Sequence, residues 1–231
     1  MNKIFVLLLV IFQVTFAQND TPEKMLKDVQ EEFSKIEDYQ VDVRIKVDVE
    51  FIKVPETKAK IYFKQPDKTH IESEGFAMLP KEGINFSPVG LLKKKHTAIF
   101  DKEEEINGIK TTRIKIIPLE EETEIILSTF WIDTKRKIVL KVESTTKTNG
   151  TFMIELNYDK PTENLYLPSS MVFSFNVDKM NIPKTWSGDL NSKKDEKKDS
   201  KPTTKGRVYI YYSNYQINKG IPDSVFEVKD K

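Results

Sequence analysis

Residues 39–51, YQVDVRIKVDVEF, decide the fold class of this chain. Apolar or aromatic side chains occupy every odd position of the segment, and polar or charged side chains occupy every even position. A period of two without a break is typical of a long β-strand with one face on an apolar core and the other in water. We therefore predict a long antiparallel strand here, with Val43, Ile45 and Val47 at the centre of its apolar face.

The same alternation returns along most of the chain. Residues 58–64 and 69–74 are predicted to form two further strands, and Ile61 and Phe63 lie on the apolar face of the first of them. Asn107-Gly108 and Asn149-Gly150 are the dipeptides favoured in tight hairpin turns. Later runs with apolar side chains at alternate positions are Thr112, Ile114 and Ile116; Ile138, Leu140 and Val142; Phe152, Ile154, Leu156 and Tyr158; and Met171, Phe173, Phe175 and Val177. With 129–133 and 207–217, the pattern predicts roughly nine to eleven strands.

One helix is predicted before the first strand. Thr21 followed by Pro22 is a typical helix start, and Glu23 suits the positive end of the helix dipole. Asp20 with Glu23 is an alternative start, as a capping box. Four apolar residues then recur at steps of three and four, which gives the helix one apolar face: Leu26, Val29, Phe33 and Ile36.

Long strands that are apolar on one face need a cover for that face. A second sheet would supply it in a sandwich, and a single, strongly curved sheet would supply it by closing on itself. The predicted helix covers part of such a sheet. The rest is covered by loops or left as a cavity.

The segment 75–92, GFAMLPKEGINFSPVGLL, is apolar but holds three glycines and two prolines. This composition is typical of neither a regular strand nor a long helix. Loops of this length inside compact domains are usually functional. Two interpretations stay open: a loop that packs on the core, and a mobile lid over an apolar site.

The first seventeen residues have the layout of a cleaved secretory signal. Lys3 precedes the apolar run 4–16, and Thr15-Phe16-Ala17 offers small residues for cleavage after Ala17. We expect residues 18–231 to form a single domain that is soluble in the bacterial periplasm. Because the chain has no cysteine, neither a lipid anchor at the cleavage site nor a disulfide is expected. The polar stretch 191–205, NSKKDEKKDSKPTTK, predicts a disordered insertion over about residues 187–206.

Several short motifs, in their order along the chain, resemble the LolA-like outer-membrane lipoprotein-sorting proteins. They are KQPDK at 64–68, GFAMLP at 75–80, WID at 131–133, and YQINKGIPD at 215–223 with Phe226. The resemblance covers nearly the whole chain after residue 17. Well-known members carry an arginine directly before the proline of the first motif, where it latches a lid. Gln65 stands there in this chain, so that latch does not carry over.

The resemblance implies an α+β fold, mostly antiparallel β, in which an N-terminal helix joins an unclosed barrel lidded by a loop or short helices. It also implies an apolar interior that takes up acyl chains, with a donor at the inner membrane and an acceptor at the outer membrane. The residues expected to form the cavity and its lid are Val43, Ile45, Val47, Ile61, Phe63, Phe76, Met78, Leu79, Phe86, Leu91, Leu92, Phe173 and Phe175.

Composition argues against other classes of function. Lys3 is the only charged residue in 1–17, so its loss leaves 36 basic against 36 acidic residues, too balanced for a nucleic-acid binder. His70 and His96 lack metal-ligand spacing, and we expect neither a metal nor a cofactor. The acidic residues Asp101 and 103–105 suit a solvated turn better than acid–base chemistry. We therefore expect a non-enzymatic carrier of lipid or lipoprotein acyl chains. The alternative is a periplasmic sensor or interaction domain with the same fold.

Overall fold

The computed structural model describes residues 21–49, 55–73, 90, 92–120, 123–176 and 205–227. Its elements, in chain order, are α1 (Pro22–Ser34), β1 (Asp38–Asp48), β2 (Thr57–Lys64), β3 (Lys68–Ser73), β4 (His96–Ile106), β5 (Ile109–Pro118), β6 (Ile125–Asp133), β7 (Ile138–Thr146), β8 (Thr151–Asn157), β9 (Ser170–Asn176), β10 (Lys205–Ile217) and the short 3-10 helix η2 (Asp223–Phe226). In this part of the chain no helix is both long and apolar enough to cross a membrane.

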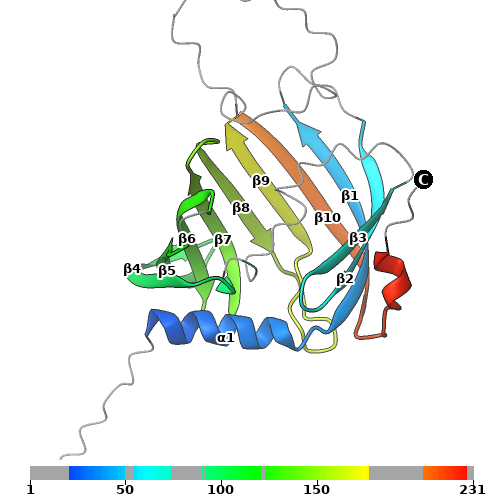
Figure 1. The fold of residues 1–231 in the computed structure, drawn as a ribbon, viewed down its shortest axis with the longest axis horizontal. Coiled ribbons are helices and arrows are strands. Elements are labelled where there is room, and N and C mark those ends of the chain that lie inside the picture. The colour runs from blue at the N-terminus through cyan, green and yellow to red at the C-terminus, as the bar shows by residue number, and fades with distance from the viewer. Residues whose placement is uncertain are drawn as a thin grey trace, which may run out of the picture.

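All ten described strands belong to one antiparallel sheet, in the order β3-β2-β1-β10-β9-β8-β7-β6-β5-β4. Consecutive strands are neighbours except for β3 and β4, and the first and last strands, β1 and β10, pair with each other. The edge strands β3 and β4 do not pair, so the sheet curves without closing (Figure 1). The prediction of a helix followed by an unclosed, mostly antiparallel β-structure is confirmed, and the sandwich is excluded for the described residues.

The helix α1 begins as the sequence indicates. Thr21 is its N-cap, and the Thr21 hydroxyl accepts a hydrogen bond from the Lys24 amide at 3.2 Å. Pro22 takes the first helical position, where its missing N–H costs nothing. Asp20, the alternative cap, lies outside the described residues. Leu26 and Val29 are buried against the sheet, because α1 lies across one end of it, beside β4 and β7 (Figure 1).

The alternation in β1 orients the strand as predicted. The apolar residues 41, 43, 45, 47 and 49 are 1–9% exposed, while Arg44, Lys46 and Asp48 between them are exposed. Cross-strand neighbours on the concave face form an unbroken apolar row over seven strands. The row consists of Ile114, Phe130, Val142, Ile154, Phe173, Val208 and Val47. Such cross-strand contacts are the main source of stability within a sheet.

One alternation differs from the sequence pattern. Ile138, Leu140 and Val142 were expected on one face, but the β6–β7 register shifts between Trp131 and Ile132. Val142 stays opposite Phe130, whereas Val139 comes to lie opposite Ile132. Val139 and Val142 therefore share the core cluster. A bulge adds one residue to one strand and reverses the facing of the residues beyond it.

A polar clamp joins the start of β1 to the end of β10. The Asp38 carboxylate, 5% exposed, accepts hydrogen bonds from the amides of residues 219, 220 and 221 at 3.0–3.3 Å. Asn218 completes the clamp: its Oδ1 accepts from the Glu37 amide at 2.8 Å and its Nδ2 donates to the Lys35 carbonyl at 2.9 Å. The clamp fixes the position of the connection between α1 and β1.

Candidate functional site

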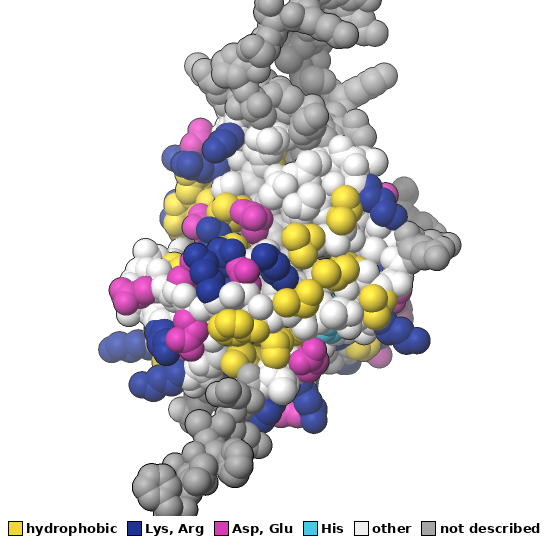
Figure 2. All heavy atoms as spheres, turned by 90° about the vertical axis from the view of Figure 1, so that its left-hand side faces the viewer, with side chains coloured by type: hydrophobic (Ala, Val, Ile, Leu, Met, Phe, Trp, Pro, Cys, Tyr) yellow, Lys and Arg dark blue, Asp and Glu magenta, His cyan; other side chains and the backbone are white. Residues whose placement is uncertain are grey.

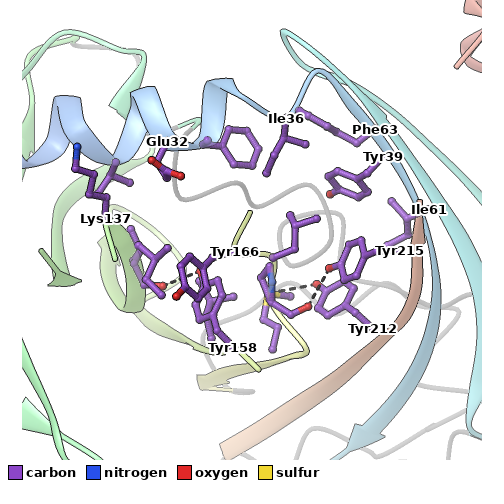
Figure 3. A pocket seen from close by; sticks show the side chains of 18 of the residues that line it. Glu32, Ile36, Tyr39, Ile61, Phe63, Lys137, Tyr158, Tyr166, Tyr212 and Tyr215 are labelled. Carbon is purple, nitrogen blue, oxygen red and sulfur yellow. Dashed lines mark hydrogen bonds between the residues drawn. The ribbon is translucent and has the colours of Figure 1, made fainter. Parts of the chain in front are cut away.

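A cavity of about 150 Å³ lies on the concave face, between the second half of α1 and the nearby ends of β1, β2, β8 and β10 (Figure 3). Val29, Phe33 and Ile36 line it from the helix side. From the sheet side the lining is largely aromatic or aliphatic: Tyr39, Ile61, Phe63, Leu156, Met171, Tyr212 and Tyr215. In the described part of the chain, Glu32 and Lys137 are the only charged residues of the lining, so this lining suits an apolar ligand.

Aromatic rings pack in a chain along one wall of the cavity. Phe63 lies 5.7 Å from Phe33 and 5.1 Å from Tyr39 between ring centroids. Tyr39 meets Tyr215 edge-on at 5.7 Å, and Tyr215 stacks with Tyr212 at 6.1 Å. These distances fall in the range of favourable aromatic pairs. The chain of rings joins α1, β2, β1 and β10 into one wall.

The tyrosine hydroxyls of the cavity fall into two kinds. Tyr158 donates to the Val139 carbonyl and Tyr215 donates to the Pro168 carbonyl, each at 2.9 Å. Tyr212 reaches only the Met171 thioether, at 4.0 Å, and a thioether is a weak acceptor. Tyr39 has no hydrogen-bond partner among the described residues, and its hydroxyl points into the cavity (Figure 3).

Burial raises the pKa of all four hydroxyls. The pKa of Tyr39 rises to about 12 because the apolar surroundings disfavour the phenolate. The pKa values of Tyr158, Tyr212 and Tyr215 are raised for the same reason. At neutral pH these groups are therefore uncharged, and they act as hydrogen-bond donors and acceptors only.

The two charged lining residues are occupied in ion pairs. The Glu32 carboxylate lies 2.6 Å from Lys35 Nζ, and Lys137 Nζ lies 3.9 Å from the Asp28 carboxylate. Lys137 comes from the β6–β7 turn and Glu32 from α1. Figure 3 places both on the side of the cavity away from Tyr39.

The expected site residues are only partly brought together at this cavity. Ile61 and Phe63 line it. Val47 and Phe173 lie in the packed apolar row, and Ile45 lies opposite Ile210, also packed. Val43 adjoins the cavity, since its cross-strand neighbour is the lining residue Tyr212.

Two further expected residues, Phe175 and Leu92, lie in the described structure. Phe175 lies over Gly206, where a β-carbon would come within 2.6 Å of the Phe175 ring. Leu92 is buried, and its carbonyl accepts a hydrogen bond from Gln30 of α1 at 2.8 Å. The other expected residues lie outside the described part of the chain, and their contacts stay a prediction: Phe76, Met78, Leu79, Phe86 and Leu91.

The sequence pattern did not single out the tyrosines as site residues. Tyr39 and Tyr158 were placed on apolar strand faces, where a tyrosine is indistinguishable from any other core residue. Tyr212 and Tyr215 lie in the run YIYYSNY at 209–215, and its density of tyrosine was the one available signal.

Gln65 forms hydrogen bonds to the connection between α1 and β1. Its side-chain amide donates to the Ile36 carbonyl at 3.2 Å, and its backbone amide donates to the Glu37 carbonyl at 2.8 Å. The neighbouring Lys64 points elsewhere, to the Ile221 carbonyl at 2.9 Å and Asp223 at 2.8 Å. Gln65 therefore ties the end of α1 to the β2–β3 turn by neutral hydrogen bonds.

The acidic residues before Asn107-Gly108 are part of a strand and not of a turn. Asp101 of β4 pairs with Arg113 and, at 3.0 Å, with Lys115 of β5. Glu104 pairs with Lys102 at 2.7 Å and accepts from the Trp131 indole. Hydrogen bonds from these partners lower the pKa values of Asp101 and Glu104. Because lowered pKa values keep both residues ionised, the cluster stabilises the outer face and does not suit a general acid.

A second hollow, of about 560 Å³, lies among β1, β2, β3 and β10, and its lining is largely charged or polar. His70 and His96 lie on the opposite edge strands β3 and β4, and no group of three potential ligands for a metal occurs among the described residues. Exposed apolar side chains gather near the β4–β5 edge, interspersed with charges (Figure 2). Two of them, Ile99 and Phe100, are consecutive in β4 and face opposite sides of the sheet, so they do not form one surface.

Solved structures with the same fold exist, although no protein-family model and no curated protein matches the sequence. A LolA superfamily protein from Nitrosomonas europaea aligns with a TM-score of 0.61 at 10% identity, covering 90% of this chain and 98% of the other. A domain from Vibrio parahaemolyticus named for outer membrane lipoprotein sorting aligns with a TM-score of 0.59 at 12% identity, covering 89% and 97%.

A DUF1329 family protein from Desulfovibrio piger aligns with a TM-score of 0.58 at 13% identity, covering 89% of this chain and 97% of the other. At identities this low, the likeness concerns the fold alone. It extends over nearly the whole of both chains in each case. The helix, the unclosed ten-stranded sheet and these alignments together establish that the protein has the fold of the LolA superfamily.

Proposed function

We propose that this protein is a periplasmic, non-enzymatic carrier that takes up acyl chains of a lipid or lipoprotein at the cavity under α1. The observation that carries the proposal is the cavity itself: a largely apolar hollow on the concave face of a LolA-superfamily fold. Burial of an acyl chain gains about 0.8 kcal/mol per methylene, so a closed apolar site is what transport through water requires.

The size of the cavity limits what it holds without rearrangement. Ligand pockets usually measure about 300–1,000 Å³. The cavity of about 150 Å³ accommodates only the end of a chain. A whole chain requires α1 to move away from the sheet. Most polar contacts that hold α1 and its C-terminal end are neutral hydrogen bonds, such as Gln65 to Ile36 and Gln30 to Leu92, and the ion pair of Asp28 with Lys137 is partly exposed. Breaking neutral hydrogen bonds costs less than breaking a buried ion pair.

The sequence-based lid fits this proposal but is not needed for it. Phe76, Met78 and Leu79 are expected to contact the ligand, together with donor and acceptor proteins at the two membranes. Cleavage after Ala17 would deliver the chain to the periplasm. These parts of the proposal stand on the sequence alone.

The proposal can be tested by filling the cavity with a larger side chain. Leu156 lines the cavity from β8, and Glu155 beside it is exposed on the opposite face. We expect Leu156→Trp to weaken binding of a fluorescent fatty acid at least tenfold, because the indole occupies the space of the chain end. Glu155→Trp, the matched control, should bind as the wild type does. Circular dichroism checks that both variants fold.

Extraction of the purified protein with organic solvent, followed by mass spectrometry, identifies any lipid that is carried. Recovered lipid supports the carrier. A protein that yields no lipid and binds the probe equally in all three forms contradicts it. Specific capture of a membrane-protein partner by such an empty protein would favour the sensor or interaction domain instead.

A further inference from the structure

The cavity holds two hydrogen-bonding groups that the fold leaves unused. The Tyr39 hydroxyl has no hydrogen-bond partner among the described residues, and the Tyr212 hydroxyl has only the Met171 thioether at 4.0 Å. Tyr158 and Tyr215, in the same cavity, are satisfied by backbone carbonyls at 2.9 Å. Both Tyr39 and Tyr212 pack in the ring chain on Tyr215, so the two unused hydroxyls belong to one wall.

A plain hydrocarbon chain is a poor occupant for that wall. Filling the cavity with methylene groups strips water from the two hydroxyls and returns no hydrogen bond. A buried hydroxyl without a partner is unfavourable, and a ligand that displaces water without replacing its hydrogen bonds loses affinity. Phenylalanine at both positions would give a purely apolar lining, as Phe33 and Phe63 do beside them.

The charge of the surroundings narrows the chemistry further. Among the described residues, Lys137 is the only cation of the lining, and it lies on the side away from Tyr39. A carboxylate next to Tyr39 would therefore be buried without a counter-charge, which is costly. The raised pKa values of Tyr39 and Tyr212 report the same resistance to negative charge at this wall. Neutral oxygen acceptors avoid that cost.

We propose that the cavity selects ligands that carry a neutral oxygen acceptor, such as an ester or amide carbonyl or a hydroxyl, on the part buried against Tyr39 and Tyr212. This rests on the proposed function and names the ligand class of the same site. Tyr39 and Tyr212 are then its specificity-determining residues. An esterified acyl group is bound through its carbonyl region, and a saturated chain end or a free carboxylate is disfavoured at this wall.

The experiment compares two ligands with equal numbers of non-hydrogen atoms, methyl decanoate and tridecane. Each displaces Nile red from the wild type, from Tyr39→Phe, from Tyr212→Phe and from the double variant. Since the two ligands differ in their affinity for any apolar site, the measured quantity is the change that each variant causes. We expect the double variant to lose about tenfold in affinity for the ester relative to tridecane, as a lost hydrogen bond in an apolar site predicts.

Tyr158→Phe and Tyr215→Phe are the matched controls. Each removes a hydroxyl of the same cavity that is already bonded to a backbone carbonyl, so each should change the two affinities by the same factor. Equal responses of ester and tridecane to the Tyr39 and Tyr212 variants would overturn the inference while leaving the proposed function standing. Failure of both ligands to displace the probe from the wild type would overturn the proposed function, and the inference with it.

Discussion

Tyr39 and Ile45 lie on the same face of β1, six residues apart, yet their surroundings differ. Ile45 is 2% exposed and lies opposite Ile210 among β-branched side chains. Tyr39 borders a cavity, between Phe63 and Tyr215. One unbroken alternation therefore runs from a close-packed region into a hollow one.

The contacts that hold the two regions differ. In the packed region, β-branched side chains alternate with the rings of Phe130 and Phe173 along the buried row from Ile114 to Val47. In the hollow region, flat rings meet at their faces and edges, with centroids 5.1–6.1 Å apart. The hollow end is held instead by polar contacts, chiefly those of Asp38, Asn218 and Gln65.

The largest expected effect on stability comes from truncating a phenylalanine to alanine in each of the two regions. Phe130→Ala, in the packed row at 0% exposure, should lower the free energy of unfolding by about 3–5 kcal/mol. Phe63→Ala should cost clearly less, because one side of that ring already faces a cavity and loses fewer contacts. Urea denaturation of both variants measures the difference. Equal losses would mean that the cavity is filled by packing in solution and that the contrast is wrong.

The next effect concerns the clamp at the hollow end. Asp38→Ala leaves the amides of residues 219–221 without their acceptor, and we expect a loss of about 2–3 kcal/mol in unfolding free energy. Asp48→Ala, at the packed end of the same strand, removes an exposed carboxylate and should change stability by less than about 0.5 kcal/mol. Thermal unfolding of the two variants measures the difference in their stability. A large loss from Asp48→Ala would show that polar contacts matter equally at both ends.

The same contrast explains what the sequence could predict. A period of two depends only on which face of a strand is buried, so the start of β1, its facing and most of the strands follow from the pattern. The position of β10 between β1 and β9 did not follow from the pattern, because strand order depends on long-range pairing. Nor did the bulge that brings Val139 opposite Ile132, since one extra residue leaves no mark on the composition.

The site was less predictable than the fold. The pattern identified the apolar face and therefore Ile61 and Phe63, but it assigned Val47 and Phe173 to a cavity with equal weight. Hydrophobicity does not distinguish a residue that fills space from one that borders it. The distinction depends on the shapes of neighbours from β2, β8, β10 and α1, which meet only in the folded chain.

The smallest expected effect comes from removing single tyrosine hydroxyls in the hollow region and measuring the change in unfolding free energy. Tyr215→Phe leaves the Pro168 carbonyl without its donor, so we expect a loss of about 1 kcal/mol in unfolding free energy. Tyr39→Phe removes a hydroxyl that bonds to no described residue, and it should leave stability nearly unchanged, because no hydrogen bond within the protein is lost. The two substitutions remove the same atom from adjoining rings, so burial and ring packing cancel in the comparison. Urea unfolding of both variants measures the difference directly. If Tyr39→Phe lowers the unfolding free energy as much as Tyr215→Phe does, the Tyr39 hydroxyl already has a hydrogen-bond partner in the empty protein. It would then not be free to bind an oxygen atom of a ligand.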